Sequence, residues 1–165
     1  MSPLFRRRQR SSEVDGLKKS WGKAAAKYMV LFLVGGLLYG GIEILWRGYT
    51  HPAMIVVGGI AFLLVGGIND WLPWKLSIIA QGIVGGTVIT GVELLSGLFL
   101  NLYLNLNIWD YSGLPFNVLG QICLPFWALW CLLAVAAVVA DDYLLYWLFA
   151  EEKPHYRFAP SWGGK

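Results

Sequence analysis

The chain has 165 residues, of which 57% are hydrophobic and only 14% are charged, and its formal net charge is +3. Soluble domains carry about 25% charged residues, so this composition excludes an ordinary soluble domain and predicts a polytopic membrane protein. The sequence has no Walker A, HExxH, GxSxG or dinucleotide-binding motif, which argues against a standard ATPase, zinc protease or serine hydrolase. It predicts no cofactor and no metal site, and it leaves enzymatic activity unassigned.

Residues 1–23 form a basic segment with little apolar content. We expect a disordered cytosolic tail whose positive charge sets the topology of the chain, with a patch for anionic lipids as the alternative. Nucleic acid is not an expected partner. The basic region runs on to Lys27, and the apolar run after it lacks a small-residue cleavage site, so we do not expect a cleavable signal peptide.

Four apolar segments follow at 24–45, 53–68, 76–100 and 122–140. The expected fold is all-α: a membrane bundle over residues 24–150 with four transmembrane helices and a short interfacial helix at 143–150. A polar cytosolic tail is expected over 151–165. The second segment spans about 24 Å at 1.5 Å per residue, which is short of a ~30 Å hydrocarbon core.

The distribution of basic residues supports four crossings of the cell membrane. With four spans, twelve of the thirteen Lys and Arg residues lie on one side, and only Arg47 lies on the other. The positive-inside rule makes the majority side cytoplasmic, so both termini are expected there. A re-entrant second segment would instead place Lys75 and the basic C-terminal residues outside.

Two glycine-rich stretches align at a constant offset of fifty: GGLLYGGIEIL at 35–45 and GGTVITGVELL at 85–95. A parallel repeat of two hairpins and a chance match between glycine-rich helices both remain open. In each stretch a glutamate, Glu43 or Glu93, continues the face formed by the small residues. Small residues let helices approach closely in lipid, so we expect both carboxylates to point into the bundle.

Arg47 lies four residues after Glu43, the spacing of an ion pair along a helix, whereas Glu93 has a glycine at that position. We therefore expect Arg47 to lie between the two carboxylates in the outer half of the bundle. A staple that joins the first and third helices and a functional polar site both remain open. His51, four residues further, is expected to cap or hydrogen-bond, with a catalytic or metal-binding role as the alternative.

The connection between the third and fourth spans is rich in amide and carboxylate side chains. We expect it to fold back over the Glu/Arg cluster as a cap, and we expect Asp110 to fix a turn with the Tyr-Ser-Gly that follows. The polar residues of this connection that join the candidate site are Asn101, Asn105, Asp110, Asn117 and Gln121.

Two further pairs of residues lie in the last span and directly after it. Cys123 and Cys131 are about 12 Å apart if helical, too far to bridge, so both are expected to be core thiols. Asp141 and Asp142 are expected to mark the hydrated cytosolic end of the span.

Four segments carry a resemblance to a known family: RGYTHP (47–52), GGIAFLLVGGIN (58–69), GVELLSG (91–97) and WDYSGLPFNVLGQICLPF (109–126). Over about residues 28–130 the chain resembles a family of small bacterial membrane proteins described as putative ABC-transporter type IV, or CmpB-like permeases. The resemblance implies a multipass permease with an ATPase partner, and it assigns no role to any residue. The inner loop at 69–75 is too short for a coupling helix.

These features predict a transporter or permease-like subunit of unknown substrate, with Glu43, Arg47, His51 and Glu93 at its site. Four helices packed through glycines leave little room for a pore, so we expect a homo-oligomer or a membrane partner subunit. One alternative is a structural or regulatory subunit. Another is a membrane-embedded enzyme acting on a lipid or lipid-linked substrate, with Glu93 or His51 as the acid/base.

Overall fold

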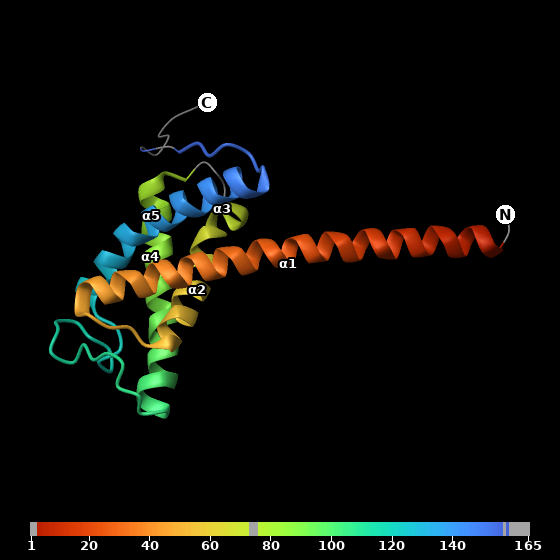
Figure 1. The fold of residues 1–165 in the computed structure, drawn as a ribbon. Coiled ribbons are helices and arrows are strands. Elements are labelled where there is room, and N and C mark those ends of the chain that lie inside the picture. Colours follow the sequence, from red (N-terminus) through yellow and green to blue (C-terminus); the bar gives the residue numbers. More distant parts are fainter. Residues whose placement is uncertain (1–2, 73–75, 157, 159–165) are drawn as a thin grey trace. The chain divides into compact units, whose positions relative to one another are not determined.

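The structure is a computed structural model that describes residues 3–72, 76–156 and 158, and its regular elements there are all helices, as the sequence predicted (Figure 1). Contacts divide the chain into two units, Met1–Val30 and Leu31–Lys165, and the site lies in the second. The elements are α1 (Pro3–Arg47), α2 (Pro52–Gly66), α3 (Ile68–Trp71), α4 (Ile78–Gly97), the π-helical turn η1 (Leu98–Tyr103) and α5 (Leu124–Phe149).

Helix α1 begins at Pro3, inside the segment for which the sequence predicted a disordered tail. Proline is well suited to the first turn of a helix, and the Arg, Lys and Glu residues that follow have high helix propensity, which accounts for the difference. The tail residues after 156, apart from 158, and the predicted inner-loop lysine Lys75 lie outside the described residues.

Among the described residues, three helical stretches are long and apolar enough to cross a membrane: Trp21–Arg47, Ile78–Tyr103 and Leu124–Phe149. Helix α2 is a shorter apolar helix of 15 residues. At 1.5 Å per residue it spans about 22 Å, so its full crossing stays a prediction. After a break at Gly67 the chain continues into α3.

The prediction of a separate interfacial helix at 143–150 is wrong, because α5 runs without interruption for 26 residues to Phe149. The expectation that Asp141 and Asp142 mark a hydrated helix end is also wrong, since both are buried within α5. The Oδ2 atom of Asp142 accepts hydrogen bonds from Asn69 Nδ2 at 2.8 Å and from the Tyr156 hydroxyl at 2.9 Å. These protein partners take the place of water, so the helix continues past the acidic pair.

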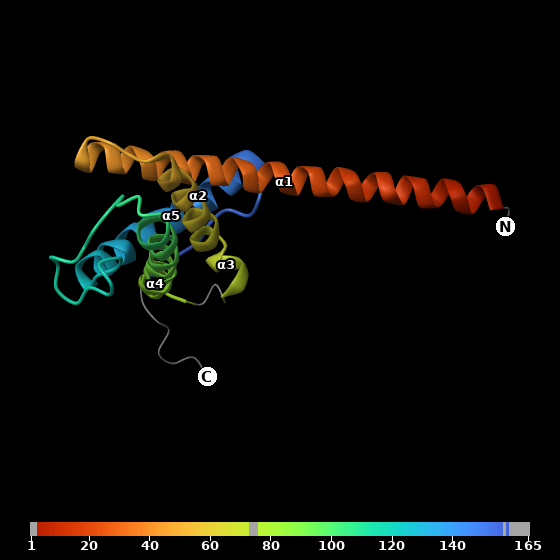
Figure 2. The ribbon, with the colours of Figure 1, turned by 90° about the horizontal axis from the view of Figure 1, so that it is seen from below.

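Glycines on α1 and α4 allow each helix to pack closely on the next apolar helix, which is α2 for α1 and α5 for α4. A Cβ added to Gly36 of α1 would lie 2.4 Å from the backbone oxygen of Ile55 in α2. One added to Gly86 of α4 would lie 2.5 Å from the sulfur of Cys131 in α5. The second unit therefore contains two close-packed hairpins, formed by the end of α1 with α2 and by α4 with α5; Figure 2 shows α4 beside α5. That these two hairpins are a true internal repeat stays a prediction.

Candidate functional site

Glu43 and Arg47 form the ion pair that their spacing predicted. Arg47 Nη2 lies 2.6 Å from Glu43 Oε1, and the two side chains are 20% and 11% exposed. The Thr50 hydroxyl donates a hydrogen bond to the other carboxylate oxygen of Glu43. Arg47 Nη1 donates to the carbonyl oxygen of Ile108 at 2.8 Å, and its guanidinium lies 4.6 Å from the centre of the Tyr49 ring. This pair therefore fastens the end of α1 to the connection between η1 and α5 (residues 104–123), which we call the outer connection after the side of the membrane on which the sequence predicts it.

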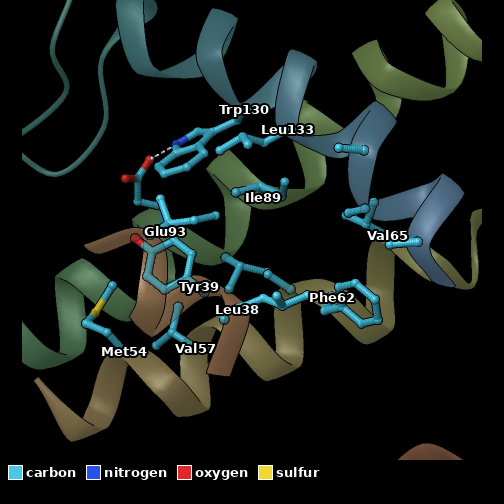
Figure 3. A pocket seen from close by; sticks show the side chains of 17 residues that line it. Leu38, Tyr39, Met54, Val57, Phe62, Val65, Ile89, Glu93, Trp130 and Leu133 are labelled. Carbon is cyan, nitrogen blue, oxygen red and sulfur yellow. Dashed lines mark hydrogen bonds between the residues drawn. The ribbon is translucent and has the colours of Figure 1, made fainter. Parts of the chain in front are cut away.

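Glu93 of α4 has different partners from those expected. It is 6% exposed, its Oε1 accepts from the Tyr111 hydroxyl at 2.8 Å, and its Oε2 accepts from Trp130 Nε1 at 2.8 Å (Figure 3). The prediction that Arg47 lies between the two carboxylates is wrong, because the guanidinium is taken up by Glu43 and a backbone carbonyl. Across the described residues, Glu93 has no ion-pair partner.

The outer connection folds back over these groups, as expected, and amide side chains hold it in place. The buried Asn101 Nδ2 donates to the Trp109 carbonyl at 3.0 Å and to Gln121 Oε1 at 2.8 Å, while its Oδ1 accepts from the Ile108 backbone at 2.7 Å. The Trp109 indole donates to the Gln121 carbonyl at 3.0 Å. Asn101 and Gln121 therefore clamp the segment that supplies the Ile108 carbonyl and the Tyr111 hydroxyl.

Three of the predicted site residues act on the connection itself. Asp110 accepts from the Ser112 backbone and hydroxyl at 2.8 and 2.9 Å, which confirms its interpretation as a turn-fixing residue. Asn117 donates to the carbonyl oxygens of Ser112 and Leu114. Asn105 is exposed, with a φ of 53°. Their hydrogen bonds shape the connection and do not reach the carboxylates.

His51 lies at the N-cap of α2, where its Nδ1 accepts a hydrogen bond from the Ala53 backbone at 3.2 Å. This is the capping role that the sequence favoured over catalysis or metal binding. Within the part of the chain that the structure describes, no three His, Cys, Asp or Glu side chains are grouped as metal ligands.

A cavity of about 230 Å³ lies between α1, α2, α4 and α5, and Glu93, Trp130 and Tyr39 meet at one end of it (Figure 3). The rings of Tyr39 and Trp130 are 6.2 Å apart and tilted by 44°. The other lining residues are apolar, among them Leu38, Ile42, Met54, Val57, Ala61, Phe62, Val65, Ile89, Val92, Leu133, Ala136, Ala137 and Ala140. The site thus combines an apolar chamber with one buried carboxylate.

The cavity reaches the surface of the bundle between α1 and α5. Its lining residues Leu38 and Ile42 are 53% and 44% exposed, and Ala136 of α5 is exposed as well. We expect acyl chains to cover this surface in a bilayer, so that the cavity would open laterally, toward lipid.

Sequence reasoning missed the aromatic members of the site, Tyr39, Tyr111 and Trp130. A signal for one of them was present, because a tryptophan within an apolar helix needs a hydrogen-bond acceptor when it is buried. The nearest carboxylates in the sequence, Asp141 and Asp142, lie on the same helix about 16 Å further along its axis, out of reach of the indole, so the sequence indicated the need but not the partner.

A family model described as "Putative ABC-transporter type IV" matches residues 35–158 of the chain. The matched region includes both hairpins, the outer connection and every residue at the carboxylate end of the cavity. No curated protein and no solved structure matches the chain.

Proposed function

Because the chain belongs to the family described as putative ABC-transporter type IV, we propose that it is a permease-like membrane subunit that binds its substrate in the cavity beside Glu93. The observation that carries this proposal is a buried carboxylate without an ion-pair partner at the end of an apolar chamber. Ligand pockets of proteins combine apolar walls with a few placed polar groups in this way.

The contrast between the two glutamates supports a binding role for Glu93. Glu43 is neutralised by Arg47, so that pair needs no further partner and is suited to joining segments. Glu93 receives hydrogen bonds from neutral donors only. A glutamine could accept from the Trp130 indole and donate to the Tyr111 hydroxyl without the cost of burying a charge, so the carboxylate is better explained by what it binds.

The setting proposed for this site is the cell membrane, with both termini in the cytoplasm and the carboxylates in the outer half of the bundle. The cavity lies among four helices of one copy, so we expect transport to require a second copy of the chain, another membrane subunit or an ATPase, as the family description suggests. The C-terminal segment held by Tyr156 on Asp142 offers a cytoplasmic surface for such a partner.

A structural or regulatory subunit is the second candidate function. It is favoured by the complete hydrogen bonding of the Glu93 carboxylate, because each of its two oxygens already has a partner within the protein. In that case the cavity would be a packing defect and would bind nothing.

Ligand-dependent thermal stability separates the two candidates. The melting temperature of purified full-length protein in nanodiscs would be measured with a panel of neutral, anionic and cationic compounds that each contain one aromatic ring. Two variants, each with one alanine replaced by leucine, would be measured in the same way. Ala61→Leu fills the cavity, whereas Ala128→Leu adds the same side chain on the exposed face of α5 outside it. We expect at least one compound to raise the melting temperature of wild type and Ala128→Leu but not of Ala61→Leu. No shift in wild type with any compound would favour the structural role.

A further inference from the structure

We propose that the ligand of this cavity is a small amphiphilic cation, an amine or quaternary ammonium group beside Glu93 with its apolar part among the aliphatic walls. This inference rests on the proposed function and names the substrate class of the same site.

The first argument is charge. Glu43 and Arg47 cancel each other, which leaves the charge of Glu93 unbalanced among the ionisable groups at this end of the bundle. Trp130 Nε1 can only donate, and burial together with the Glu93 carboxylate raises the pKa of Tyr111 well above its ordinary value, so its hydroxyl stays protonated and donates. Both carboxylate oxygens therefore act as acceptors. In surroundings of low dielectric constant, the electrostatic attraction between a cation and such a carboxylate is strong, whereas an anion is repelled.

The second argument is the arrangement of the aromatic rings. Tyr39 and Trp130 both line the cavity at the Glu93 end, with their ring centres 6.2 Å apart. The faces of aromatic rings attract organic cations, and this attraction is how aromatic cages recognise quaternary ammonium groups. A metal ion would need several oxygen, nitrogen or sulfur ligands, and among the described residues no three His, Cys, Asp or Glu side chains are grouped together here.

The third argument is size and access. An engineered cavity of about 150 Å³ holds one benzene molecule. The cavity of about 230 Å³ therefore has room for one ring or a short alkyl chain together with a compact ammonium group. Its lateral opening past Leu38 and Ile42 faces the acyl chains, where the apolar part of an amphiphile already resides. A large hydrophilic cation would fit neither the walls nor the opening.

An isosteric pair of probes tests the inference directly. Equilibrium binding to full-length protein in phosphatidylcholine nanodiscs would compare benzyltrimethylammonium with neopentylbenzene, which has the same shape but no charge, and with benzenesulfonate as the anion. We expect wild type to bind the cation at least tenfold more tightly than the neutral isostere, relative to empty nanodiscs, and to bind no anion. Glu93→Gln should remove that preference and leave binding of the isostere unchanged. Ala61→Leu should weaken both, and Ala128→Leu neither.

The outcomes separate this inference from the proposed function. Equal binding of the cation and its isostere in wild type would overturn the cation inference and leave the cavity as a binding site. Absence of binding by all three probes would overturn both. If Glu93→Gln does not fold, the ratio of the two affinities in wild type, with Ala61→Leu as the control for location, decides the question.

Discussion

The ion pair between Glu43 and Arg47 can be tested by double-mutant cycles that also include Glu93. Arg47→Met removes a guanidinium that contacts a carboxylate at 2.6 Å and the Ile108 carbonyl at 2.8 Å. Breaking a fully buried pair costs about 3–5 kcal/mol, and because this pair is partly exposed we expect a loss of about 2–3 kcal/mol in the free energy of unfolding. Glu43→Gln should cost about 1–2 kcal/mol. The double variant should be more stable than the sum of the two losses predicts, by about 1–2 kcal/mol.

The same cycle between Arg47 and Glu93 should show no coupling. The two residues share no hydrogen-bond partner, so the effects of Arg47→Met and Glu93→Gln should add to within about 0.5 kcal/mol. The measurement is reversible unfolding in mixed detergent micelles, followed by the circular dichroism of the helices. A larger coupling of Arg47 to Glu93 than to Glu43 would refute the geometry described for both carboxylates.

Three further substitutions, one of them with a matched control, test the surrounding structure. Asn101→Leu removes a buried side chain with three hydrogen bonds, and we expect a loss of about 3 kcal/mol and faster proteolysis of the outer connection. Gly86→Ala places a Cβ 2.5 Å from a sulfur in α5 and should lower the melting temperature, whereas Gly91→Ala, with nothing within 4 Å, should not. Trp130→Phe keeps an aromatic ring but leaves one oxygen of Glu93 without its donor, so a loss of about 1–3 kcal/mol is expected in the same unfolding assay. An unchanged free energy of unfolding for Trp130→Phe would contradict that hydrogen bond.

The sequence predicted those parts of the fold and site that depend on residues near one another in the chain. Hydropathy predicted the helices, and helical spacing predicted the pair of Glu43 and Arg47, because both effects act over one or two turns. The partners of Glu93 lie 18 and 37 residues away, and the periodicity that marks an inward face does not say which side chain meets it there.

The same reason explains the error at Asp142. Two acidic residues after an apolar run are typical of a hydrated helix end, and the partner that keeps them buried, Asn69, is 73 residues away. The local pattern does favour a helix end, but the tertiary contact with Asn69 stabilises a buried aspartate in a helix that continues. The outer connection was easier to predict, since a dense group of amides beside a bilayer must find internal partners.

The cavity lies in the interface between the two hairpins, and a hydrogen bond connects the two sides of this interface at each of its ends. At one end Arg47 holds the Ile108 carbonyl, and at the other Asn69 holds Asp142. Between these two points the walls are apolar and the opening faces acyl chains. A ligand of the proposed site would therefore exchange with the bilayer and not with water, so its occupancy would follow its partition coefficient as much as its aqueous concentration. Lipid molecules would then compete with the ligand for the site, so the lipid composition of the bilayer would affect binding.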